Sequence, residues 1–189
     1  MQELKYLVVF NNNASNLIEI YLQNNCLKRI ASEICNVPQI SVLSVRNNEL
    51  ETLPHEIYKL SKLKELSVGG NMLRYLPGEI LELELESVFL TPNPWMNGPE
   101  IEEFNGQNKF SIPSMKEMAA RSVLSKENAT TEIRPQGFCS KCKMSIQQPA
   151  IKEIRIGSIL SHSVPLLFNF CSQKCSLQNE ACGSQTSKQ

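Results

Sequence analysis

The sequence reads ISVLSVRNNELETLPHEIYKL at residues 40–60 and then LKELSVGGNMLRYLPGEILEL at residues 63–83. Both stretches fit the pattern L-x-x-L-x-L-x-x-N-x-L-x-x-L-P-x-x-I-x-x-L. A looser copy begins at Leu17, and the first half of a fourth begins at Leu85 and stops at Trp95. The asparagines of the four copies stand at positions 25, 48, 71 and 93, so the period of the repeat is nearly constant. A constant period of this kind predicts a stack of similar structural units.

This pattern is the signature of leucine-rich repeats. It predicts an α/β leucine-rich-repeat solenoid with a short, curved parallel sheet over residues 1–95, because no single coil can bury its apolar side alone. The first half of each copy is expected to be a strand, and the second half a short helical or extended return. The asparagine amide is expected to bond backbone groups that burial would otherwise leave unpaired.

The first repeat is expected to be shortened. The segment from Leu4 to Asn12 matches the strand half of a repeat, but the next strand begins at Leu17, well before a full period has passed. Either this segment is an abbreviated cap that shields the core from water, or the chain is part of a longer array.

The variable strand positions are expected to form three columns on the concave face of the sheet. The columns are Tyr6, Glu19, Val42, Glu65 and Ser87; Val8, Tyr21, Ser44, Ser67 and Phe89; and Phe10, Gln23, Arg46, Gly69 and Thr91. Exposed aromatic side chains near an arginine are typical of protein interfaces. We therefore expect a protein partner to contact Tyr6, Phe10, Glu19, Tyr21, Gln23, Arg46 and Glu65. The alternative is that Tyr6, Val8 and Phe10 lie under a capping segment.

Residues 96–135 differ in composition from the repeats. The stretch NGPEIEEFNGQNK at 97–109 predicts a closing loop, residues 111–124 predict an amphipathic helix, and the polar residues up to 135 predict a linker. Ser111 can cap this helix, and Pro113 is tolerated in its first turn. Met115, Ala119 and Val123 share one face of it. This stripe either packs under the last repeat as a cap or inserts into the groove of a partner.

Residues 136–178 hold two close pairs of cysteines, Cys139 with Cys142 and Cys171 with Cys175, ahead of a polar tail at 179–189. The pairs bracket two strand-like runs that read as a hairpin. Four thiolates brought together in this way suit a structural zinc ion, with no coordination position left for water. A module of about 40 residues usually needs such a metal in order to fold.

Two other assignments of the cysteines and histidines remain open in the sequence. His162 lies between the strand-like runs and could replace one thiolate, or the four cysteines could be ordinary buried thiols. Cys26 and Cys35 lie within the first full repeat and have no metal-ligand partner nearby in the sequence. We expect both to be packing residues.

The chain resembles a group of short intracellular eukaryotic leucine-rich-repeat proteins that end in a cysteine hairpin. The resemblance rests on the repeats, on the closure at Asn93 and Pro94, on the stretch PSMKEMAARSV at 113–123, on Pro149 and on the two cysteine pairs. It covers most of residues 17–176, and it implies an architecture more than an activity.

Helix 111–124 is also similar to the box through which cullin-RING ubiquitin-ligase substrate receptors dock elongin C. The matching positions are Ser114 with Met115, Ala119 and Val123. Methionine stands in place of the usual leucine, and alanine in place of the usual cysteine. This similarity implies an alternative function, that of a ligase substrate receptor.

Composition favours some classes of function over others. Lys and Arg number 19, as do Asp and Glu, so the net charge is near zero and gives no electrostatic case for nucleic acid or an anionic membrane. No apolar run is long enough to span a bilayer. The N-terminus does not read as a signal peptide, which favours the cytoplasm, without excluding the nucleus, and reduced or metal-bound cysteines.

No motif of a known catalytic site is found in the sequence. Its two histidines, His55 and His162, belong to no recognisable catalytic motif, and neither a phosphate-binding loop nor a dinucleotide fingerprint is present. We therefore expect a non-enzymatic module for protein–protein interaction, with the concave repeat face as its binding surface.

Overall fold

The computed structural model describes residues 7–12, 16–108, 137–146 and 149–177. The described residues fall into two compact units. The first holds the residues up to Asn97 together with Ile156–Leu166, and the second holds the remainder. Each unit is described by itself below.

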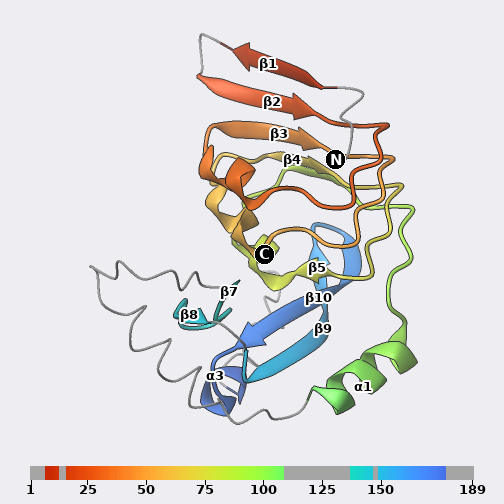
Figure 1. The fold of residues 1–189 in the computed structure, drawn as a ribbon, viewed down its shortest axis with the longest axis vertical. Helices are drawn as coiled ribbons and strands as arrows, with labels where there is room; N and C mark the ends of the chain where they lie inside the picture. Colours follow the sequence, from red (N-terminus) through yellow and green to blue (C-terminus); the bar gives the residue numbers. More distant parts are fainter. Residues whose placement is uncertain (1–6, 13–15, 109–136, 147–148, 178–189) are drawn as a thin grey trace, which may run out of the picture. The chain divides into compact units, whose positions relative to one another are not determined.

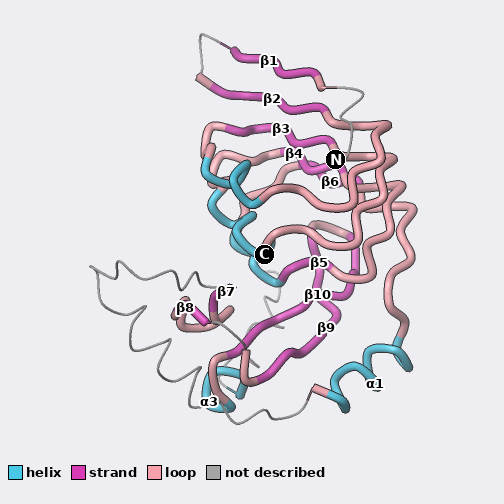
Figure 2. Tube along the Cα trace, viewed as in Figure 1, coloured by secondary structure: helices cyan, strands magenta, loops and turns pink. Residues whose placement is uncertain are grey.

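The first unit is built on a five-stranded sheet (Figures 1 and 2). Its strands, in spatial order, are β1 (Val8–Asn12), β2 (Leu17–Tyr21), β3 (Ile40–Ser44), β4 (Glu65–Ser67) and β6 (Ser87–Phe89). The four strands from β2 to β6 are parallel to one another, whereas β1 runs antiparallel to β2. Consecutive parallel strands lie one repeat apart in the sequence, so equivalent positions of the repeat become neighbours.

A short 3-10 helix lies on the return path of each repeat. These helices are η1 (Ser32–Asn36), η2 (His55–Lys59) and η3 (Gly78–Glu82), each five residues long. The two-residue strand β5 (Leu76–Pro77) directly precedes η3. Pro54 and Pro77 hold the extended conformation at the N-caps of η2 and η3, which the fixed φ of proline favours. One turn of helix is enough to bury Ile57 and Ile80.

The core of this unit consists of the apolar positions of the repeat. The fully buried side chains are Ile40, Leu43, Val45, Leu50, Leu53, Ile57, Leu60, Leu63, Leu66, Val68, Leu73, Leu76 and Ile80. Burying a side chain of this size contributes about 1.5–3 kcal/mol relative to leaving it in water. The same positions are buried in the repeats at 40–60 and 63–83, whereas the side chains of β2 in the first repeat are only partly buried, so the stabilisation is greatest in the middle of the stack.

The repeated asparagines connect each turn to the preceding one. The Nδ2 atom of Asn48 donates to the carbonyl oxygens of Leu22 and Val45, at 2.9 Å each, while its Oδ1 accepts from Leu27 N at 3.0 Å. Asn71 and Asn93 make the same three bonds one and two repeats later. The expected role of these amides in satisfying backbone groups is thereby confirmed for the described repeats.

The residue before each of three buried asparagines has a left-handed backbone. The φ angles are 59° at Asn24, 54° at Asn47 and 71° at Gly70. Asparagine and glycine are the residue types that adopt this conformation most readily. The Asn-Asn and Gly-Asn pairs of the sequence are therefore explained by the turn that follows each strand.

The second unit contains the helix α1 (Gly98–Gln107), the ribbon of β7 (Gly137–Phe138) and β8 (Ser145–Ile146), and the helix α3 (Gln173–Leu177). It also holds the open ends of a long hairpin, β9 (Ile151–Ile159) and β10 (His162–Phe170). The Asn105 side chain of α1 bonds both the N–H and the carbonyl of Ile154, at 2.8 and 2.9 Å. It thus occupies the hydrogen-bonding edge of β9 as a neighbouring strand would.

The predicted leucine-rich-repeat solenoid with a separate, small zinc-hairpin module is wrong. The described chain is a mixed α/β fold with a five-stranded and a three-stranded sheet, besides the short β7–β8 ribbon, and its only α-helices there are α1 and α3. A solenoid would present one parallel sheet from end to end. Here β1 is antiparallel, and β5 joins β10 and β9 in the three-stranded sheet. The hairpin tip at 156–166 accordingly belongs to the first unit.

Two local predictions are also wrong. The predicted closing loop at 97–109 contains the helix α1, whose first turn carries Pro99 and Glu100 and which buries Ile101. The segment at 4–12 is not the strand half of a further parallel repeat, since its described part, β1, pairs antiparallel with β2. Val8, Val9 and Phe10 are consequently about half exposed.

Candidate functional site

Two features of the described structure are candidates for function: a cluster of four cysteines and a pocket on the parallel sheet. The cysteine cluster brings together Cys139, Cys142, Cys171 and Cys175, whose sulfur atoms all lie within 4.8 Å of one another. The Sγ of Cys171 lies 3.6 Å from that of Cys142 and 3.6 Å from that of Cys175. The tetrahedral edge around a zinc ion is about 3.8 Å for a zinc–sulfur bond of about 2.3 Å. The four thiols therefore lie close enough to hold a metal ion.

Local hydrogen bonds fix the first cysteine pair. Between β7 and β8, Cys139 N donates to Met144 O and Lys143 N donates to Cys139 O, both at 2.9 Å, which closes the turn around Cys142. Ser140 N donates to Asn169 O at 2.7 Å, and the Ser140 hydroxyl accepts from Asn169 N at 2.9 Å. This reciprocal pair holds the turn beside the end of β10, next to Cys171.

The second pair is held by a polar cluster at the base of the hairpin. Arg155 forms a two-point ion pair with Glu153 at 2.8 and 3.0 Å, and Glu153 accepts from the Ser176 hydroxyl at 3.2 Å. The Arg155 guanidinium lies 5.9 and 5.8 Å from the ring centres of Phe168 and Phe170. Because Ser176 follows Cys175 in α3, this cluster positions the fourth thiol.

The ionisation of the four thiols reflects their crowding. Burial raises the pKa of Cys171, as do hydrogen bonds to Cys142 and Cys175, and burial also raises the pKa of Cys142. At Cys139 burial opposes ionisation, but the backbone N–H groups of Cys142, Cys171 and Lys141 outweigh it and lower the pKa. A bound cation would favour the thiolate form of these cysteines, because metal ligation requires deprotonated sulfur.

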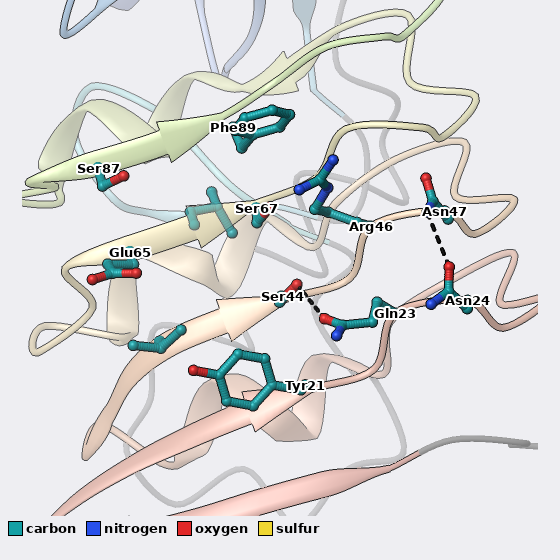
Figure 3. A pocket seen from close by; sticks show the side chains of 12 residues that line it. Tyr21, Gln23, Asn24, Ser44, Arg46, Asn47, Glu65, Ser67, Ser87 and Phe89 are labelled. Carbon is teal, nitrogen blue, oxygen red and sulfur yellow. Dashed lines mark hydrogen bonds between the residues drawn. The ribbon is translucent and has the colours of Figure 1, made fainter.

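The pocket lies on the face of the five-stranded sheet and has a volume of about 530 Å³ (Figure 3). Its lining residues are Tyr21, Gln23, Asn24, Val42, Ser44, Arg46, Asn47, Glu65, Leu66, Ser67, Ser87 and Phe89. No histidine or cysteine is among them. The lining is instead that of a recognition surface, with two aromatic rings, two opposite charges and several small hydroxyl groups.

Strand register sets the order of the side chains in the pocket. Glu19, Val42, Glu65 and Ser87 are in register across β2, β3, β4 and β6, as are Tyr21, Ser44, Ser67 and Phe89. These two predicted columns are confirmed for the parallel strands. Val8, the predicted first member of the second column, is also in register with Tyr21, whereas antiparallel β1 places Phe10 opposite Glu19 and not in the predicted column of Gln23.

Short contacts hold the polar side chains of the pocket in place. The Tyr21 hydroxyl donates to Glu19 Oε2 at 3.0 Å, and this bond, together with burial and the charges of Glu19 and Glu65, raises the pKa of Tyr21. Ser44 Oγ donates to Gln23 Oε1 at 2.8 Å. Arg46 Cζ lies 4.1 Å from the ring centre of Phe89. The surface is thus ordered before a ligand arrives.

The structure brings together only part of the predicted partner-binding set. Tyr21, Gln23, Arg46 and Glu65 line the pocket, whereas Phe10 and Glu19 do not. Phe10 packs edge-on against Tyr21, with 5.9 Å between ring centres, and Glu19 holds the Tyr21 hydroxyl. Tyr6 lies outside the described residues.

Phe89 is the main pocket residue that the predicted set omits. It is 49% exposed and supplies the ring on which Arg46 stacks. The signal was present in the sequence, since Phe89 stands in the same column as Tyr21 and in the adjacent column to Arg46. The prediction gave more weight to the aromatics near the N-terminus.

Three further predictions concern residues outside these two sites. Cys35 is buried as expected, but Cys26 is exposed, so its predicted packing role is wrong. His162 is exposed at the start of β10 and is not among the clustered metal-binding residues. The helix at 111–124, with Met115, Ala119 and Val123, lies outside the described residues.

The search for known relatives gives no identification. No protein-family model matches the sequence, and no curated protein is significantly similar to it. Within the described ranges, no helix is both long enough and apolar enough to cross a membrane.

Proposed function

We propose that this chain is a non-enzymatic protein-binding module whose binding surface is the pocket on the face of β2, β3, β4 and β6. The observation that carries the proposal is the pocket lining. It combines half-exposed Phe89, the stacked Arg46 and the ordered Tyr21 on one rigid sheet. Aromatic and arginine side chains of this kind account for much of the binding energy at protein interfaces.

The rigidity of the sheet supports this proposal. The strands under the pocket are joined by backbone ladders and by the buried asparagines, and the inward side chains Leu43 of β3 and Leu66 of β4 are fully buried. A surface that is already ordered loses little conformational entropy on binding. The pocket lining contains neither histidine nor cysteine and consists mainly of aromatic, hydroxyl and charged side chains, which suits recognition.

Site-directed crosslinking tests the proposal. A photoreactive amino acid at Ser67, in the centre of the pocket, is expected to capture a protein partner in cells. The same amino acid at exposed Glu33, on the return helix η1, serves as the matched control. Adding Tyr21→Ala and Arg46→Ala is expected to abolish the adduct at 67 while lowering the melting temperature by no more than about 4 °C. Equal adducts at 67 and 33, or an adduct that survives the double substitution, would reject the pocket as the binding surface.

For the cysteine cluster we infer that the bound metal is zinc and that its role is structural. Four thiolates in two close pairs favour zinc over magnesium or calcium, which prefer oxygen ligands. Four cysteine ligands also fill a tetrahedral site, which leaves no position for substrate. Elemental analysis of the purified chain is expected to give one zinc per chain, and none in a Cys139→Ser, Cys171→Ser variant. Iron in place of zinc, or no bound metal, would contradict the assignment.

A further inference from the structure

The two charged side chains of the pocket stand at its opposite ends. Glu65 lies at one end and Arg46 at the other, with Ser67 between them (Figure 3). Glu65 pairs in register with Val42, and Arg46 follows Val42 by four residues along the same chain. Backbone pairing continues past the end of β3, with Val45 N bonded to Ser67 O and Asn47 N to Gly69 O. At about 3.3 Å per residue, four residues span about 13 Å along the strand direction, so the backbone positions that carry the negative and the positive end lie about this far apart.

Both charges are available to a ligand. Within the described ranges, neither Arg46 nor Glu65 forms an ion pair, and the carboxylate of Glu65 is exposed. Arg46 Nε is buried and has no hydrogen-bond partner there. Stacking on Phe89 covers one face of the guanidinium and leaves the edge of its terminal N–H groups for a carboxylate.

We infer, resting on the proposed function, that the partner presents an extended segment with an acidic and a basic side chain four residues apart. In an extended chain, residues i and i+4 point to the same side and lie about 13 Å apart. The acidic side chain then meets Arg46 and the basic one meets Glu65. Residue i+2 faces the floor between them, where Ser44 and Ser67 offer small side chains. A spacing of three residues would turn one of the two charges away from the pocket.

Synthetic peptides test this inference with the full, metal-loaded chain. The probes are short peptides of one length and composition that carry a single Glu and a single Lys two, three, four or five residues apart, in both orders. The four-residue spacing is expected to bind about tenfold more tightly than the three-residue spacing, in one of the two orders. In the Arg46→Ala variant, peptide affinity is expected to depend no longer on the Glu of the peptide. In the Glu65→Gln variant, it is expected to depend no longer on the Lys.

A charge-swapped variant provides the strictest control. Arg46→Glu with Glu65→Arg keeps the net charge of the chain and exchanges the ends of the pocket. It is expected to prefer the peptide with the opposite order of Glu and Lys. Equal binding of all spacings, no measurable binding of any peptide, or an unchanged order in the swapped variant would overturn the inference. If crosslinking at 67 still captures a partner in that case, the proposed binding surface stands and only the partner's charge pattern is rejected.

Discussion

The two units of this protein are stabilised in opposite ways. In the first unit, apolar side chains and asparagine amides recur at the same positions of each repeat, and every turn of the chain is bonded to the next. In the second, four thiols from two distant stretches of the chain meet at one point. We expect distributed contacts to make the first unit tolerant of a single loss, whereas the proposed structural metal would make the second depend on one site. We expect perturbations of the two units to have very different consequences.

The largest expected effect is that of metal removal on the second unit. Structural zinc binding contributes about 10–16 kcal/mol to the folding of small zinc modules, so a strong chelator is expected to unfold the segments at 138–155 and 167–177. The backbone amides of residues 40–90 are expected to stay protected from hydrogen exchange, as measured by mass spectrometry. The transition should occur more readily at acidic pH, because protons compete with the metal for the thiolates. Full protection of 138–155 without metal would show that the two units do not differ in this way.

Removing one asparagine amide tests how strongly the first unit depends on each turn. Asn48→Ala removes the bonds of this side chain to Leu22 O, Val45 O and Leu27 N. The expected cost is about 2 kcal/mol, because three hydrogen bonds are lost and Leu27 N loses its acceptor, while Leu22 O and Val45 O still accept from Asn25 and Asn71. Native-state hydrogen exchange of β3 and β4 measures it. The control is Asn36→Ala, at an exposed site at the end of η1, with an expected change below about 0.5 kcal/mol. Similar effects of the two substitutions would contradict the role of the buried amides.

Asn105→Ala tests whether the second unit has a support other than its metal. The substitution removes both bonds to the backbone of Ile154, and we expect a loss of about 2 kcal/mol in the metal-loaded protein. Faster hydrogen exchange in β9 is the measured quantity. Gln107→Ala on the same helix removes only an exposed contact with Glu103 and should cost a few tenths of a kcal/mol. Equal hydrogen-exchange rates of β9 in the two variants would indicate that the metal is the main support of β9.

The smallest effect concerns the two cysteines of the first unit. Burial raises the pKa of Cys35 to about 11, so about one molecule in a thousand carries the reactive thiolate at pH 8. Cys26 is exposed. The test uses a metal-loaded chain in which the remaining cysteine of the sequence, Cys182, is replaced by serine. In this chain a thiol reagent is expected to modify Cys26 at least about 100-fold faster than Cys35, as followed by peptide mass spectrometry. Adding Cys26→Ser should remove the fast phase. Rapid modification of Cys35 would indicate that η1 opens more readily than the rest of the stack.

The sequence predicts most of what depends on the repeat. The hydrogen bonds of Asn48 and Asn71, the buried face of β3 and β4, and the register of Val42 with Glu65 all follow from the period of the pattern. The hairpin and the approach of the four cysteines are likewise confirmed. Each of these features has a local signal, such as an alternation, a turn residue or a paired spacing.

The features that the sequence does not predict depend on longer-range contacts. Pairing of β5 with β10 joins residues far apart in the chain, and nothing in Leu76–Pro77 indicates it. The antiparallel pairing of β1 with β2 has no local signal, because the residues of β1 match the strand half of a repeat. The residues that form α1 include Gly, Asn and acidic residues, which are also typical of loops, so the sequence there does not indicate a helix. Because these contacts have no local signal, the sequence pattern predicts a solenoid although the described fold is mixed α/β.

The most direct test of the account compares crosslinking at Ser67 in the metal-loaded and the metal-free chain. The central claim is that binding resides on the sheet of the first unit, while the metal supports the second. We predict the same partner adduct at 67 in both states, with hydrogen exchange confirming that only the second unit has lost protection. Loss of the adduct on chelation, with the protection of 40–90 unchanged, would place the binding function in the cysteine unit and contradict the account.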